Sequence, residues 1–307
     1  MDSRAPATTE LELKLDPEEE CRRIEEFIAQ AIEDLGRKGA VVGLSGGLDS
    51  TVVAWLCVRA LSPQKVLGLI MPERDSNPQN IADAREIARE LGIEVEEIDL
   101  TPLLEQIGIY KLIPRWAAKR GKFIEGMYKT FKKGKKVNYL IHSLGPAAER
   151  HEFHFSSFIQ PKLRLRMILL YYHAGLRDYA VVGTTNRTEW EVGHYDRYGD
   201  GACDVDPIKH LYKIQVKELA RYLGVPEKII EKPASPDLIA GITDELTLGM
   251  SFEELDPILF LLSQGLSDEE IARKLNVDQR AVEEARKAVE GARKMRELPV
   301  TVRSPKS

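Results

Sequence analysis

Cysteine is scarce in this sequence, and long apolar runs are missing. The three cysteines, Cys21, Cys57 and Cys203, lie far apart and form no Cys-x-x-Cys pair, which argues against a disulfide framework and a zinc site. No segment approaches the roughly 20 apolar residues that span a bilayer. The first residues also lack the basic and then apolar pattern of a secretory signal. We therefore expect a cytoplasmic protein with no membrane partner.

An excess of positive charge is missing as well. The chain has 44 Lys and Arg against 49 Asp and Glu, a net charge of −5 and a pI near 5.8. This balance gives no general affinity for polyanions, so nucleic acid is not expected as a partner unless a local patch binds it. With 307 residues and 43% hydrophobic content, the chain can form one large domain or two modest ones.

The usual residues of covalent catalysis are not apparent either. We find no Ser-His-Asp or Cys-His arrangement, and the six histidines, at positions 142, 151, 154, 173, 194 and 210, show no metal-ligand spacing. The sequence therefore predicts neither a covalent enzyme intermediate nor a histidine-bound metal.

Residues 43–50 read Gly-Leu-Ser-Gly-Gly-Leu-Asp-Ser and stand between an apolar run, residues 40–42, and an apolar-periodic one. The expected order is strand, tight glycine turn, helix. Such a turn gathers backbone N–H groups at a helix N-terminus, where the macrodipole also favours negative charge. It is a phosphate cradle, and Asp49, which cannot bind phosphate directly, is best explained as holding Mg²⁺ against it.

The segment Ser-Gly-Gly-x-Asp-Ser resembles the pyrophosphate loop of the N-type ATP pyrophosphatases, which adenylate a carboxylate or carbonyl carbon and release pyrophosphate. It does not fit the Walker pattern, because it has no lysine and no Gly-Lys-Ser/Thr ending. The alternative is a glycine-rich turn that only reverses the chain. Six matching positions between a strand and a helix favour the pyrophosphate loop.

The apolar runs predict the fold class. Strands are expected at residues 40–42, 66–71, 93–100 and 179–182, with helices between them, so the chain begins as β-α-β-α-β. This pattern predicts an open, mostly parallel, doubly wound α/β sheet of five strands, of the adenine nucleotide alpha hydrolase type, with a C-terminal helical extension. Ligands bind such a sheet beyond the carboxyl ends of its strands. We expect phosphates at the loop after the first strand and the nucleoside at the loop after the second.

Composition divides the chain further. We expect a flexible arm at 1–16, an ATP-pyrophosphatase α/β domain at 17–250 with a basic insertion at 108–155, a helical extension at 251–299 and a tail at 300–307. Within 108–136, ten Lys or Arg stand against a single Glu, with aromatic residues among them. This stretch is either a pair of solvated surface helices, a cover over an anionic ligand, or a nucleic-acid patch. Residues 266–280 have helix-turn-helix spacing, but their mixed charge favours a packing role.

The second half of the chain offers a partner for Asp49. The strand at 179–182 ends in the polar residues 183–186, and Glu189 follows where its carboxylate could complete the oxygen shell of Mg²⁺. Arg164 and Arg166 lie in an otherwise apolar helix, where unpaired guanidinium groups are costly unless they face a cleft. We therefore expect Arg164 to pair with a phosphate or carboxylate of the acceptor substrate, with the insertion closing over it.

Taken together, the motifs resemble ammonia-dependent NAD⁺ synthetase from about residue 20 to residue 299. The set is, in order, residues 45–50, Arg164-x-Arg166-Met167, Gly183-Thr184, Glu189, Tyr198-Gly199-Asp200-Gly201 with Asp204, Lys213, and Lys232-Pro233 with Ser235 and Asp237. The order and spacing carry the resemblance.

The resemblance implies site residues for each substrate. ATP binding falls to Gly43, Leu44, Ser45, Gly46, Gly47, Leu48, Asp49, Ser50, Thr184, Lys213 and Ser235. Ser45, Asp49 and Lys213 would be catalytic, and Asp49 and Glu189 would hold Mg²⁺. Deamido-NAD⁺ would be bound by Arg164, Arg197 and Asp204.

The acceptor half departs from the family pattern at several positions. Arg197 replaces a lysine, Leu246 and Thr247 replace an acidic pair, and Lys294 and Met295 replace a His-Lys pair. An arginine keeps the charge of the lysine but presents a planar fork. An NAD⁺ synthetase-like enzyme with a different carboxylate or nucleotide acceptor is therefore the first alternative. A nucleotide-gated nucleic-acid-binding protein is the second.

The resemblance implies a C–N bond-forming ligase. A carboxylate is a poor electrophile, so the carboxylate of deamido-NAD⁺ would attack the α-phosphorus of ATP, and ammonia would then displace AMP. Mg²⁺ and the loop N–H groups would stabilise the departing pyrophosphate. We expect free ammonia as the nitrogen donor, since the chain has no room for a glutaminase domain. The family also implies a homodimer, for which the apolar segment 252–262 offers some support.

Overall fold

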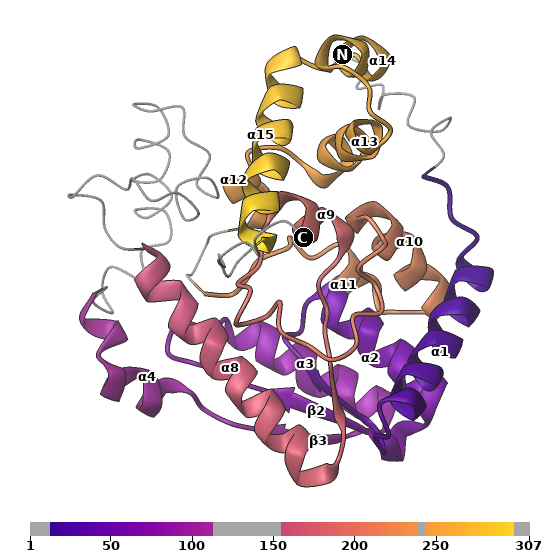
Figure 1. Cartoon of the computed structure of the whole chain (residues 1–307). Helices are drawn as coiled ribbons and strands as arrows, with labels where there is room; N and C mark the ends of the chain where they lie inside the picture. The colour runs from indigo at the N-terminus through magenta and orange to yellow at the C-terminus, as the bar shows by residue number, and fades with distance from the viewer. Residues whose placement is uncertain (1–12, 113–154, 239–242, 298–307) are drawn as a thin grey trace, which may run out of the picture.

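The computed structural model describes residues 13–112, 155–238 and 243–297. Four parallel strands form its sheet in the order β3 (Glu94–Glu97), β2 (Val66–Ile70), β1 (Ala40–Gly43) and β4 (Ala180–Val182) (Figure 1). The chain runs outward from β1 to β3 and then returns to the other side of β1. The carboxyl ends of β1 and β4 therefore form the switch point at which open parallel sheets bind ligands. The predicted open parallel α/β fold is confirmed.

The expected fifth strand is not present among the described residues. Beyond β4 the sheet continues only as a single parallel bridge between Val182 and Val205. The reason lies in Asp204, whose carboxylate accepts the Val181 N–H at 2.9 Å in place of a backbone carbonyl. Pro207, which has no N–H to donate, follows three residues later. The third strand is also shorter than predicted, four residues where 93–100 was expected.

Alternate side chains of the central strands enter two separate cores. Ala40 and Val42 pack with the first layer of helices, and Val41 faces the other layer. Both faces are covered, which explains why β1, β2 and β4 are almost wholly apolar. The first layer contains α1 (Pro17–Asp34), α2 (Leu48–Leu61), α3 (Pro78–Leu91), α10 (Lys213–Leu223) and α11 (Glu227–Ile230), and the second contains α4 (Thr101–Ile107) and α8 (Phe155–Arg177). Short 3-10 turns, η2 (Pro63–Lys65) and η3 (Ile109–Lys111), join these elements.

A third core belongs to the later helices, α9 (Arg187–Val192), α12 (Asp244–Leu248), α13 (Phe252–Ser263), α14 (Asp268–Leu275) and α15 (Gln279–Arg296). In Figure 1, α13, α14 and α15 lie at the top, beyond the α/β layers. A capping box between Ser267 and Glu270, visible in the sequence as a serine three residues before a glutamate, starts α14. Because α15 packs against α9, α13 and α14, its apolar face is used inside the chain.

The folded body begins before α1. Leu13 is buried in the core of the later helices, and its carbonyl accepts the Gln215 side-chain N–H at 3.2 Å. Asp16 caps the first turn of α1. The packed chain therefore starts four residues earlier than the arm of residues 1–16 implied, and 1–12 lie outside the described residues. Most of the basic insertion, 113–154, lies outside them too. No helix in the described ranges is long and apolar enough to cross a membrane.

Candidate active site

The loop between β1 and α2 leaves the N-terminus of a helix uncapped by any side chain. Gly47 is the N-cap of α2 and provides no side chain to cap it, so the first N–H groups of the helix stay available to a ligand. Ser45 and Ser50 close the loop, with their hydroxyl oxygens 2.9 Å apart, and the Ser45 hydroxyl accepts the Gly47 N–H at 3.2 Å. The expected order of strand, tight glycine turn and helix is therefore present, and phosphate binding by this loop stays a prediction.

Two contacts from outside hold this loop in place. Gly46 has a φ of +72°, and a Cβ at this position would lie 2.1 Å from the backbone oxygen of Asn80 in α3. Lys232 donates to the Gly46 carbonyl at 2.8 Å and pairs with the buried carboxylate of Asp83. The sequence placed Lys232 in the family pattern but gave it no role. Its contacts show that it fixes the position of the loop backbone.

One cavity of about 570 Å³ opens beside the loop, at the carboxyl ends of β1, β2 and β4. Every residue predicted to bind ATP or Mg²⁺ lines it except Gly46, which shapes the loop from behind. The lining set is Gly43, Leu44, Ser45, Gly47, Leu48, Asp49, Ser50, Thr184, Glu189, Lys213 and Ser235. Segments more than 180 residues apart in the chain therefore meet at the switch point.

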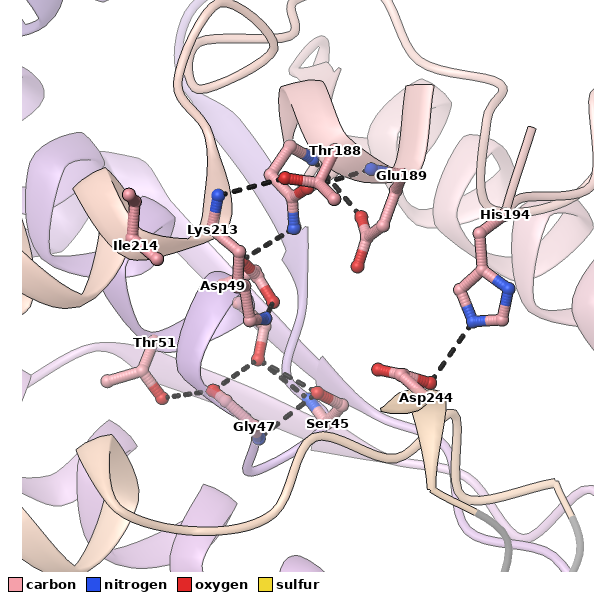
Figure 2. A network of polar contacts seen from close by, with 12 residues as sticks. Ser45, Gly47, Asp49, Thr51, Thr188, Glu189, His194, Lys213, Ile214 and Asp244 are labelled. Carbon is pink, nitrogen blue, oxygen red and sulfur yellow. Dashed lines mark hydrogen bonds and ion pairs between the residues drawn. The ribbon is translucent and has the colours of Figure 1, made fainter. Parts of the chain in front are cut away.

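Asp49 is the centre of a charged group in this cavity (Figure 2). Its carboxylate pairs with the Lys213 ammonium and accepts the Asn186 side-chain N–H at 3.1 Å. Asn186 also caps α9 and exchanges hydrogen bonds with Glu189 in a capping box. Asn186 therefore fixes both predicted metal ligands, a role that sequence reasoning missed although an asparagine three residues before a glutamate is a capping-box signal.

The electrostatics of this group favour a cation. Burial, together with the charge of Asp49, raises the pKa of Glu189 to about 8. Burial alone would lower the pKa of Lys213, but Asp49 and Glu189 outweigh it and raise that pKa. Among the described residues no three acidic, histidine or cysteine side chains group as a metal site. Mg²⁺ is commonly held by one or two carboxylates with phosphate oxygens and water, which two carboxylates beside a phosphate cradle would suit.

A second charged pair lies on the far side of Glu189. The His194 ring nitrogen Nε2 is 3.1 Å from the Asp244 carboxylate, and both residues line the cavity (Figure 2). Burial opposes protonation of His194, but the hydrogen bond and charge of Asp244 raise its pKa. Asp200 is also in the lining, and burial raises its pKa to about 6. These pairings join segments that are distant in the sequence, so no local pattern predicts them.

The residues predicted to hold the acceptor do not line the cavity. Arg164 forms a two-point pair with Asp196, each bond 3.1 Å long, and the expected pairing of Arg164 with the acceptor stays a prediction. Arg166 is the arginine that faces the cavity. Residues two apart on a helix point to different sides, which separates these two arginines. Asp204 is exposed and accepts the Tyr171 hydroxyl at 3.1 Å.

Two of the departures from the family pattern touch each other. The Arg197 guanidinium donates to the backbone carbonyl of Met295 at 3.2 Å. Met295 lies near the end of α15, where it also approaches Gly193 of the cavity lining. Of the other departures, Thr247 lines the cavity and Lys294 is exposed. The changes at 197 and 295 therefore form one local rearrangement beside the cavity.

A parallel sheet with a phosphate cradle and paired carboxylates at its switch point defines a nucleotide-using α/β enzyme of the ATP-pyrophosphatase type. The family model described as NAD synthase matches residues 20–152 and 123–299. The chain belongs to the NAD synthase family.

Individual relatives agree with this assignment. The NH(3)-dependent NAD(+) synthetase of Thermotoga maritima is 44% identical over 285 residues, which are 90% of this chain and 96% of that protein. Among solved structures, an NMN synthetase from Francisella tularensis matches with a TM-score of 0.68 and 28% identity over 94% of this chain and 99% of that one. An NH3-dependent NAD synthetase from Campylobacter jejuni matches with a TM-score of 0.66 and 26% identity, covering 94% and 100%.

Proposed function

We propose that this protein amidates deamido-NAD⁺ with ammonia, using ATP and releasing AMP and pyrophosphate, to form NAD⁺. The observation that carries the proposal is the meeting of the phosphate cradle, Asp49, Glu189 and Lys213 in one cavity. It occurs in a chain that is 44% identical over 90% of its length to an NH(3)-dependent NAD(+) synthetase. The first step would join a carboxylate oxygen to the α-phosphorus of ATP and break the bond to pyrophosphate. In the second step ammonia would take the carbonyl carbon, and AMP would leave.

The cavity residues divide this work. The loop N–H groups and the Lys213 ammonium would bind the phosphates and stabilise charge on the departing pyrophosphate. Mg²⁺, held by Asp49 and Glu189, would supply further charge neutralisation at the phosphate oxygens. Lys213 pairs with Asp49 in the structure, and we expect it to turn toward phosphate when Mg²⁺ and ATP bind. Burial keeps these interactions strong because water screens them little.

The identity of the acceptor substrate is a separate question, and two observations support a second candidate acceptor. The similarity to an NMN synthetase structure and the departures at Arg197 and Met295 favour considering a mononucleotide acceptor, nicotinate mononucleotide. Arg166 is placed to meet an anionic group of either acceptor from inside the cavity. The family resemblance implies that Arg164 binds the acceptor. Arg164 would first have to break its ion pair with Asp196.

The function is tested with purified protein, ATP, MgCl₂ and ammonium chloride, supplied with either deamido-NAD⁺ or nicotinate mononucleotide. We expect NAD⁺ and pyrophosphate in equal amounts from deamido-NAD⁺, and a much lower kcat/KM for the mononucleotide. Replacing ammonium by glutamine tests the nitrogen source and should stop the reaction. Pyrophosphate release with the mononucleotide alone would move the proposal to the second acceptor. No pyrophosphate with either acceptor would refute both.

A homodimer also remains a proposal, but its support changes. The segment expected to provide the interface is buried inside the chain, with Phe252, Ile258 and Leu259 at most 2% exposed. The exposed apolar stripe lies instead on α8, where Ile168, Tyr172 and Leu176 are 55%, 58% and 62% exposed at four-residue spacing. Such stripes are typical of protein interfaces. We propose that two copies pair through α8.

We therefore expect the mass of a dimer in light scattering at micromolar concentration. Ile168→Asp combined with Leu176→Asp should convert it to a monomer, because two charges would enter the interface. The matched control site is Leu35, which is 48% exposed at the end of α1. Leu35→Asp should leave the dimer intact. A wild-type monomer, or a dimer that survives both α8 substitutions, would contradict the proposal. The cytoplasmic location and the lack of nucleic-acid binding stay predictions.

A further inference from the structure

Asp256 is a buried carboxylate that the proposed chemistry does not use. It lies inside α13, is 0% exposed, and does not line the cavity. A carboxylate in such a place is costly unless hydrogen bonds satisfy its oxygens. No ion pair of Asp256 with a lysine or arginine is found among the described residues, so its partners must be hydrogen-bond donors.

The donors come from two other helices. The carboxylate of Asp256 accepts the Thr188 hydroxyl at 2.6 Å and the backbone N–H of Ile214 at 2.9 Å. The Thr188 oxygen in turn accepts the backbone N–H of Lys213 at 3.0 Å (Figure 2). The Asp256 carboxylate and the Thr188 hydroxyl therefore satisfy the first two N–H groups of α10, and the Thr188 side chain joins α9 to this network. Both turns present positive dipole ends, which favour a negative charge, but burial outweighs them and raises the pKa of Asp256 to about 7.

Each of these two turns carries an active-site residue. Glu189 directly follows Thr188 on α9, and Lys213 directly precedes Ile214 on α10. The two side chains approach Asp49 from different elements, and the chemistry depends on their separation. Two hydrogen bonds to Asp256 and a third between Thr188 and Lys213 set that separation, because together they join the Thr188 side chain of α9 to the backbone of the first turn of α10.

We propose that Asp256 is a positioning residue for the reaction, which sets the spacing of Lys213 and Glu189 about Asp49 from the helical unit formed by α13, α14 and α15. This unit is then part of the catalytic machinery although Asp256 touches no substrate. The inference rests on the proposed function of the cavity and deepens it.

The test is Asp256→Asn, which keeps the size of the side chain but offers an N–H group to a neighbour that is itself a donor. We expect kcat for NAD⁺ formation to fall by about 10- to 100-fold and the half-saturating Mg²⁺ concentration to rise several-fold. The KM for deamido-NAD⁺ should change less than about twofold, since KM changes alone would indicate lost substrate contacts. Asp268→Asn is the matched control: Asp268 pairs with Arg286 at 2.7 Å in the same helical unit, far along the chain from the cavity residues.

Thr188 provides a second pair of variants. Thr188→Val removes the hydroxyl and keeps the shape, so it should reproduce the loss, whereas Thr188→Ser should retain more activity because it keeps the hydroxyl. Since both residues act through one network, the double variant Asp256→Asn/Thr188→Val should lose less than the product of the single losses. If Asp256→Asn does not fold, Thr188→Val carries the test.

Calorimetric binding of Mg²⁺ with a non-hydrolysable ATP analogue separates this inference from the proposed function. Weaker Mg²⁺-dependent binding in both variants supports the positioning role even if the acceptor assignment fails. The proposal is overturned if Asp256→Asn and Thr188→Val keep kcat and Mg²⁺ dependence within about twofold of wild type. It is also overturned if Asp268→Asn loses as much activity and Mg²⁺ affinity as Asp256→Asn does, because the effect would then be general to the helical unit.

Discussion

Replacing Asp49 by asparagine is expected to lower turnover by on the order of 10²- to 10³-fold or more while the protein stays folded. Asp49 is the residue to which Lys213 and Asn186 both bind, and it shares the cavity with Glu189. The substitution removes one of the two carboxylates that we propose as ligands of Mg²⁺. It should not unfold the protein, because Glu189 remains to neutralise Lys213. The same loss of a like charge should lower the pKa of Glu189 from its present value of about 8.

The measurement is steady-state pyrophosphate release, with the unfolding temperature recorded alongside. Asp178→Asn is a suitable control, since Asp178 pairs at the surface with Arg37 at 2.9 Å just before β4, at the opposite edge of the sheet. Surface pairs of this kind contribute at most about 1 kcal/mol, so the control should be fully active. Near wild-type turnover in Asp49→Asn would show that the metal and phosphate assignments are wrong.

The parts of the site that the sequence predicted are local ones. The run from Gly43 to Ser50 specifies its own turn, because glycine spacing, hydroxyls and the following helix act within eight residues. Capping boxes such as that of Ser267 and Glu270 are equally local. Glu189, which lines the cavity, was singled out because it lies shortly after the end of a strand. In each case the physical cause lies within a few residues, and the pattern is sufficient.

The parts that could not be predicted depend on distant contacts. Sequence placed Arg164 and Arg166 together, but which of them faces the cavity depends on how α8 is rotated against the sheet. The hydrogen bond from Lys232 to the Gly46 carbonyl joins positions 186 residues apart. The missing fifth strand depends on a side chain, Asp204, that takes the place of a backbone acceptor. Periodicity cannot reveal any of these.

Gly46→Ala is expected to weaken ATP use by on the order of 10²-fold, since a displacement of about 1 Å in positioning groups can have that effect. Two costs act at this position. A φ of +72° costs an alanine about 1 kcal/mol or slightly more, and the new Cβ would meet the Asn80 backbone oxygen at 2.1 Å. Asn80 is held in α3 and cannot give way easily, so the loop must move instead. This shift would also pull the Gly46 carbonyl away from Lys232.

Gly92→Ala separates the two costs. Gly92 ends α3 with a φ of +66°, but nothing lies within 4 Å of a Cβ placed there. Both variants should therefore lose a small amount of thermal stability from backbone strain, and Gly46→Ala should lose more because its Cβ also meets Asn80. Only Gly46→Ala should raise the KM for ATP or lower kcat, because only there does the strain come with a displaced phosphate cradle. Equal activity losses in the two variants would mean that backbone strain alone is responsible, and an active Gly46→Ala would mean that the loop does not contact phosphate through this backbone conformation.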